Sequence, residues 1–204
     1  MKRKIMTNNN LAEWKEKYRV RMGLFFGLIF IWRAQPRTVL FLVPGLLLAS
    51  VGLFLRQWAA GCIKKNDALA RTGPYALLRH PLYAGSFLLA FGLIFASTSF
   101  NLSISKPYLD RTLFYWSFFW LMVESVYLPK VDKEEAMLKA KFPEDYDRFA
   151  AEVPRFIPKE FVLPKIKPEE FSWEIWKKNK EYFSLVGFLF LAALLIARYH
   201  YGLP

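Results

Sequence analysis

Cysteine is nearly absent from this chain of 204 residues, and its absence limits what the protein can be. The single Cys62 excludes an intramolecular disulfide and any multi-cysteine metal site. Two familiar signatures are missing as well. No G-x-G-x-x-G string follows a strand-like segment, which argues against a Rossmann domain, and no Ser-His-Asp set can be recognised, which argues against a hydrolase. No cleavable signal peptide is expected.

Charge is also nearly absent, but only from certain parts of the chain. Although 23% of the residues are charged, five apolar runs carry very little charge, at about 20–32, 39–58, 82–98, 112–128 and 182–197. Apolar runs of about 17–25 residues are typical of membrane-spanning helices, and the first run is short for a span. The sequence therefore predicts an all-α, polytopic integral membrane protein.

The distribution of Lys and Arg supports counting the first run as a span. With five spans, one side of the membrane collects 24 of the 29 basic residues and the other collects 5, whereas with four spans the division is 12 against 17. Basic residues gather on the cytoplasmic side of short loops. We therefore predict five transmembrane helices, a cytoplasmic N-terminus and an outer C-terminus. His80 and His200 then fall on opposite faces, so they cannot share a metal, and no metal site is predicted.

The topology also accounts for the formal net charge of +12, since basic loops attract anionic lipid headgroups. We expect the lipid bilayer as a partner and no nucleic acid. Residues 1–204 are predicted to form one domain, with a core at about 50–158, a linker and fifth transmembrane helix at 159–204, and a cytoplasmic amphipathic segment before that last helix. The sequence gives no prediction of oligomeric state.

Two polar clusters are expected to meet at the cytoplasmic face. The string "GPYALLRHPLYAG" (73–85) precedes the third apolar run, and Glu134-Glu135 follows the fourth. A short connection between these runs makes them an antiparallel hairpin. Gly73-Pro74 predicts a turn and Pro81 predicts a helix start, which places His80 beside a helix N-terminus that can receive a carboxylate.

Each polar residue also has an ordinary structural interpretation. Arg79 and Tyr83 share a face if the helix begins early, or they simply anchor the chain in the headgroup region. Glu135 fits a capping box that starts at Asp132, and Glu134 fits a solvated surface charge.

Two further charged residues stay open. Arg155, between proline and phenylalanine, has two interpretations: it binds an acidic ligand, or it anchors the chain to a lipid phosphate. Glu124 lies inside the fourth apolar run, where an ionisable residue suggests function, and either Arg56 or a buried water is a candidate partner for it.

The two strings, "GPYALLRHPLYAG" and "EEAMLKAKFPEDYDRFAAEVPRFIP", together resemble the isoprenylcysteine carboxyl methyltransferase family and its phospholipid methyltransferase relatives. The resemblance covers about residues 50–158. It implies an integral membrane enzyme that uses S-adenosyl-L-methionine to methylate a lipophilic, membrane-embedded acceptor, with an isoprenylcysteine-like carboxylate as the best guess. The site would face the cytoplasm.

By this resemblance, Arg79 and Arg155 are the predicted catalytic residues. The predicted cofactor-binding residues are Tyr75, His80, Pro81, Tyr83, Gly85, Glu134 and Glu135. Alternative functions are methylation of a phospholipid or another small lipophile, an NADPH-dependent sterol-type reductase, and a non-catalytic membrane scaffold.

Overall fold

The computed structural model describes residues 25–63, 69–98, 106–159 and 171–202, and every regular element in these ranges is helical. After a helical stretch at 25–33, the elements are α2 (Val39–Cys62), the 3₁₀ turn η1 (Gly73–Ala76), α3 (Pro81–Ser97), α4 (Lys106–Met122), the π-helical turn η2 (Val123–Tyr127), α5 (Leu128–Lys141), α6 (Pro143–Glu152), α7 (Trp173–Lys178) and α8 (Tyr182–Tyr201). The predicted all-α class is confirmed. The first apolar run is helical from residue 25, and its residues 20–24 lie outside the described ranges.

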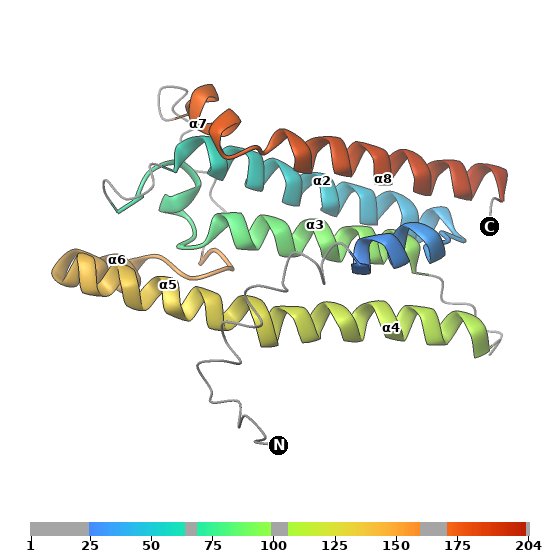
Figure 1. Cartoon of the computed structure of the whole chain (residues 1–204), viewed down its shortest axis with the longest axis horizontal. Helices are drawn as coiled ribbons and strands as arrows, with labels where there is room; N and C mark the ends of the chain where they lie inside the picture. Colours follow the sequence, from blue (N-terminus) through green and yellow to red (C-terminus); the bar gives the residue numbers. More distant parts are fainter. Residues whose placement is uncertain (1–24, 64–68, 99–105, 160–170, 203–204) are drawn as a thin grey trace, which may run out of the picture.

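Small residues bring α2 and α3 into direct backbone contact. A Cβ added at Gly52 would lie 2.4 Å from the backbone nitrogen of Leu89, and one added at Gly92 would lie 2.4 Å from that of Ala49. Such a close approach is open only to residues without a side chain. Residues later in α2 contact residues earlier in α3, so the two helices are antiparallel. They form the centre of the molecule (Figure 1).

The apolar core surrounds this pair. It is formed by residues of the 25–34 segment, α2, α3, α4, η2 and α8, namely Phe30, Ala34, Leu42, Ala49, Leu93, Ile94, Ala96, Tyr115, Phe119, Val123 and Leu195.

One uninterrupted run of helix joins α4 to α5 through η2, and it appears as a single long rod in Figure 1. Pro129 lies near the start of α5. A proline inside a helix lacks the N–H that would bond four residues back and crowds the carbonyl there, which here belongs to Ser125. Ser125 lies inside the π turn, so the wider turn relieves the conflict without ending the helix.

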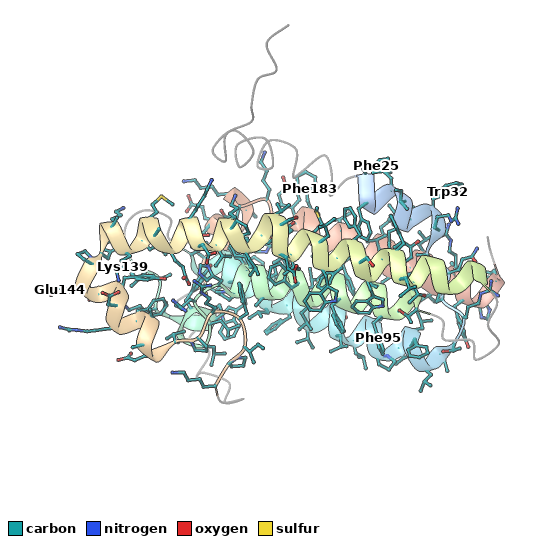
Figure 2. The ribbon with its side chains drawn as sticks, turned by 90° about the horizontal axis from the view of Figure 1, so that it is seen from below. Phe25, Trp32, Phe95, Lys139, Glu144 and Phe183 are labelled. Carbon is teal, nitrogen blue, oxygen red and sulfur yellow. The ribbon has the colours of Figure 1, made fainter. Side chains whose placement is uncertain are left out.

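The chain then folds back on itself. Lys139 and Glu144 mark the bend at one end of the molecule, where α5 gives way to α6 (Figure 2). Tyr146 and Phe149 of α6 are buried, and Leu138 of α5 packs against them. α6 occupies residues 143–152 and begins at Pro143. Proline is favoured at the first position of a helix. The acidic residues in the first turn of α6 also stabilise it, because they lie at the positive end of the helix dipole.

Among the described residues, two helices are long and apolar enough to cross a membrane. These are α2, with a mean hydropathy of 2.2, and α8, with a mean hydropathy of 1.8. The most apolar window of α8 is only 6% buried, so this helix presents its apolar surface outward. α3 is apolar but shorter. The structure therefore supports two candidate spans, and the five-span arrangement stays a prediction.

Candidate functional site

The loop before α3 pairs with the loop after α6. The backbone N–H of Arg79 donates to the carbonyl of Pro154 at 2.8 Å, and that of His80 donates to the carbonyl of Arg155 at 3.2 Å. Gly73 has φ 56° at the turn, and Pro81 is the first residue of α3, so the predicted turn and helix start are confirmed. Because α3 begins at Pro81, Arg79 precedes the helix, and the condition under which it would share a helix face with Tyr83 is not met.

The two predicted polar clusters meet at Glu135. Its Oε1 lies 3.1 Å from Nε2 of His80, 3.1 Å from a terminal nitrogen of Arg79 and 3.1 Å from Nε of Arg155. Its Oε2 accepts a second hydrogen bond from Arg155, at 2.5 Å. Arg79 also donates to the hydroxyl of Tyr146 at 3.2 Å. We call these five residues the Glu135 centre. The expected juxtaposition is confirmed, whereas the predicted chemical roles stay predictions.

Burial and the neighbouring cations set the charges in this centre. Burial by itself raises the pKa of Glu135, but the hydrogen bonds from Arg155 and His80 and the charge of Arg79 outweigh it, so the pKa lies below its usual value. Burial lowers the pKa of His80 despite its hydrogen bond to Glu135. The hydrogen bond to Glu135 raises the pKa of Arg155. At neutral pH the centre therefore holds an ionised carboxylate, a neutral imidazole that donates from Nε2, and two guanidinium groups.

Aromatic side chains cover the His80 side of the centre. The ring of His80 lies 5.9 Å from that of Tyr83 and 6.0 Å from that of Phe156, measured between centroids. The ring of Phe87 contacts those of Phe156 and Tyr127 at 5.6 and 5.5 Å. Sequence reasoning missed Tyr127 and Phe156, because aromatic residues in so apolar a chain do not stand out. Tyr127 belongs to η2, so the π turn also helps to shape this wall.

Tyr75 occupies a neighbouring cluster with Trp58, Ala59 and Cys62, rather than the Glu135 centre. Its hydroxyl is buried and has no hydrogen-bond partner in the part of the chain that the structure describes. Burial raises the pKa of Tyr75, and the charge of Glu134 raises it further. Glu134 is thus near enough to affect this phenol.

Pro81 and Gly85 are placed by packing. Pro81 is fully buried at the start of α3. A Cβ at Gly85 would lie 2.7 Å from the carbonyl oxygen of Gly52 and 2.8 Å from the backbone nitrogen of Arg56. In the structure, these two residues help α3 to pack closely against α2.

Two structural interpretations of acidic residues are wrong. Asp132 lies inside α5 and not at its start, so it forms no capping box with Glu135, and it pairs with Arg155 at 3.0 Å instead. Glu124 is exposed on η2, and its suggested partner Arg56 binds Glu181.

The Glu135 centre is poorly suited to a divalent cation. It offers one imidazole and one carboxylate, and both carboxylate oxygens already accept hydrogen bonds from guanidinium groups. A cation bound there would face two positive charges at short range. Among the described residues, no group of three or more His, Cys, Asp or Glu side chains could hold a metal ion.

The fold and the site define an all-helical protein with two candidate membrane spans and a buried ion-pair centre where two loops meet. Two characterised proteins are similar to it in sequence. The nickel-cobalt-cadmium resistance protein NccN of Alcaligenes xylosoxydans xylosoxydans is 31% identical over 117 residues, which is 56% of this chain and 47% of the relative. The cobalt-zinc-cadmium resistance protein CzcN of Cupriavidus metallidurans is 32% identical over 157 residues, which is 76% of this chain and 66% of the relative.

This chain thus matches about half of one relative and just under two thirds of the other. No protein-family profile matches the chain. No solved structure matches it either.

These relatives overturn the identification as a methyltransferase. Both are named for metal resistance, and neither name fits an S-adenosylmethionine-dependent carboxyl methyltransferase, a phospholipid methyltransferase, a sterol-type reductase or a scaffold. The physical reason for the error lies in the motif residues. Arg79, His80 and Glu135 bind one another and fasten two loops together, and such a structural role does not by itself fix the chemistry of a protein.

The prediction of S-adenosyl-L-methionine as cofactor came with that identification, and no observation tests it. The same holds for the lipophilic acceptor.

Proposed function

We propose that this chain is an integral membrane protein that contributes to resistance against divalent transition-metal ions, with nickel, cobalt, zinc and cadmium as the candidates. The similarity to CzcN over 157 residues carries the proposal. A match that covers 76% of a chain of 204 residues must include its middle wherever the match begins. Arg79, His80 and Glu135 therefore lie inside it.

We further propose that the Glu135 centre is required for this function without holding the metal ion itself. Its arginines occupy the carboxylate that a cation would need. Its geometry instead suits it to fixing the loop at 79–80, the loop at 154–155 and helix α5 in one arrangement.

We also propose that the membrane topology is multi-pass, with five spans and the Glu135 centre on the cytoplasmic side. The outward-facing apolar surface of α8 and the length of α2 support two of these spans. The division of 24 basic residues against 5 supports the remaining spans and the orientation.

Growth of a metal-sensitive bacterial host tests the function. Expression of the chain should raise the inhibitory concentration of at least one of the four metals, with cellular metal content measured in parallel by mass spectrometry. Glu135→Gln should lose the effect. Asp145→Asn is the matched control, because it removes a carboxylate from an exposed pair with Arg71 and should retain resistance. If the membrane-inserted protein changes tolerance to none of the four metals, the proposal fails.

The single cysteine makes the topology directly testable. Cys62 is buried and should react little, so Asp145→Cys and Gly202→Cys each add one exposed thiol. In intact cells, a membrane-impermeant maleimide should label Gly202→Cys and leave Asp145→Cys unlabelled until the cells are opened. Labelling of both positions in intact cells would contradict the proposed orientation.

A further inference from the structure

A second polar cluster joins α2, α3 and the start of α8, away from the Glu135 centre. Arg56 donates from Nε to Oε2 of Glu181 and from a terminal nitrogen to Oε1, both at 2.8 Å. Its other terminal nitrogen lies 2.5 Å from Oγ of Ser86 on α3. The Glu181 side chain is only 7% exposed. Two parallel hydrogen bonds between guanidinium and carboxylate form the strongest and most directional kind of ion pair.

Neighbouring polar groups complete the Glu181 side of this pair. Ser184 donates to Oε2 of Glu181 at 2.8 Å, and Gln57 donates to Ser184 at 2.7 Å. The indole N–H of Trp176 on α7 donates to Gln57 at 2.6 Å. The first turn of α8 is therefore tied to α2, α3 and α7 by polar contacts.

The backbone that delivers Glu181 is strained. Lys180, the preceding residue, has φ 56°, and it is the only residue other than glycine with positive φ in the described ranges. A lysine in this region costs energy and persists only where the surrounding structure requires it. Asn179, one residue earlier, donates to the carbonyl of Ala60 at 2.9 Å near the end of α2. Contacts with α2 thus stabilise the bend at 179–181 in this conformation.

The rest of α8 packs through few side chains. Leu195 is its only buried residue, and Phe188 and Leu191 are partly buried against the core, while Phe183, Val186, Leu189 and Phe190 are among its exposed side chains. Figure 2 shows Phe183 on an outer edge of the molecule. At the far end, Arg198 donates to the carbonyls of Ile31 and Ala34. The polar contacts of α8 thus lie at its two ends, at Arg56–Glu181 and at Arg198, and apolar packing holds the helix between them.

We propose that the Arg56–Glu181 pair is a latch: while it is formed, the first turns of α8 are seated against α2 and α3, and when it is broken, this end of α8 swings away about the Arg198 end. An ion pair between apolar helices suits this task, because its partners attract strongly when paired and are costly to bury when separated. The strain at Lys180 favours release once the pair is lost. Through Ser86, the latch also contacts α3, whose N-cap residue is His80 of the Glu135 centre.

Distances between spin labels on α8 and α2 test the latch in the full chain, reconstituted in lipid with Cys62→Ser. One pair, Phe54→Cys with Phe183→Cys, reports on the latch end. A second pair, Leu40→Cys with Ile196→Cys, reports on the Arg198 end. All four positions are exposed. Arg56→Gln and Glu181→Gln should each lengthen and broaden the distance distribution of the first pair and leave the second unchanged.

Two further variants separate a latch from general loss of structure. The exchanged pair Arg56→Glu with Glu181→Arg should recover the short distance at least in part, whereas Arg71→Gln, which opens the exposed Arg71–Asp145 pair, should change neither distance. The latch is refuted if the first distance is unchanged in both single variants, or if both label pairs change together. The measurement does not involve metal tolerance, so it stands or falls separately from the proposed function.

Discussion

Replacing Glu135 with glutamine should be the most damaging conservative change in the Glu135 centre. The substitution keeps the shape of the side chain and removes its charge. Arg79, whose side chain is 14% exposed, then loses its 3.1 Å carboxylate partner, and His80, 3% exposed, exchanges a charged acceptor at its Nε2 for a neutral amide oxygen. The Arg155 side chain is 43% exposed and keeps its ion pair with Asp132, so the loss of its contact with Glu135 adds little to the destabilisation.

Breaking a buried ion pair by removing one partner costs about 3–5 kcal/mol, and the lower end applies here because Arg155 lies partly in solvent. For a chain of this length, about 3 kcal/mol corresponds to a fall of roughly 6–12 °C in Tm. The assay is thermal unfolding of the detergent-solubilised protein, followed by tryptophan fluorescence.

Asp145→Asn provides the comparison for this measurement. Its pair with Arg71 is exposed on both sides, and such pairs contribute about 0–1 kcal/mol, so the shift in Tm should be small. Equal shifts for Glu135→Gln and Asp145→Asn would refute the claim that burial of the centre makes its charges important.

Three other outcomes are expected. The pKa of His80 is lower in the folded state than in the unfolded state, so the unfolded chain binds more protons on acidification. The free energy of unfolding should therefore be highest above about pH 6.5 and fall below it. A Tm that is independent of pH between about 7 and about 5.5 would contradict this. Gly92→Ala places a methyl group against the backbone of Ala49 and should lower stability by about 1–3 kcal/mol in the same unfolding assay, whereas no change would show that the helices separate freely. Lys180→Gly should preserve or raise Tm because glycine accepts φ 56°, whereas Lys180→Val should lower it by at least about 1 kcal/mol, and the reverse order would show that the bend is unstrained.

The parts of the fold that follow local rules were predictable. Apolar runs identified α2, α3, α4 and α8, and Gly73, Pro74 and Pro81 identified the turn and the start of α3. The hairpin argument then brought His80 to Glu135 across 55 residues, because loop length and parity constrain where helix ends meet.

The features that sequence reasoning missed depend on distant contacts. Arg56 is one candidate partner for Glu124 in the sequence, but in the structure it pairs with Glu181, which lies 125 residues away and follows a strained bend that no sequence pattern predicts. The capping box at Asp132 is absent because no helix begins there. The π turn accommodates Pro129, so the helix continues through α5 and Asp132 lies in its interior. The family resemblance failed because a motif that fastens two loops together does not by itself fix the chemistry of a protein.

The unbroken rod formed by α4, η2 and α5 has a mechanical consequence. Glu135 lies eight residues beyond the π turn, about 12 Å along the axis at 1.5 Å per residue. A tilt of about 10° about that turn would displace Glu135 sideways by about 2 Å, enough to separate it from His80 and Arg79. The rod therefore acts as a lever arm. Under the proposed five-span topology, a change in bilayer thickness that alters the tilt of α4 would strain the ion pairs at the far end of the rod.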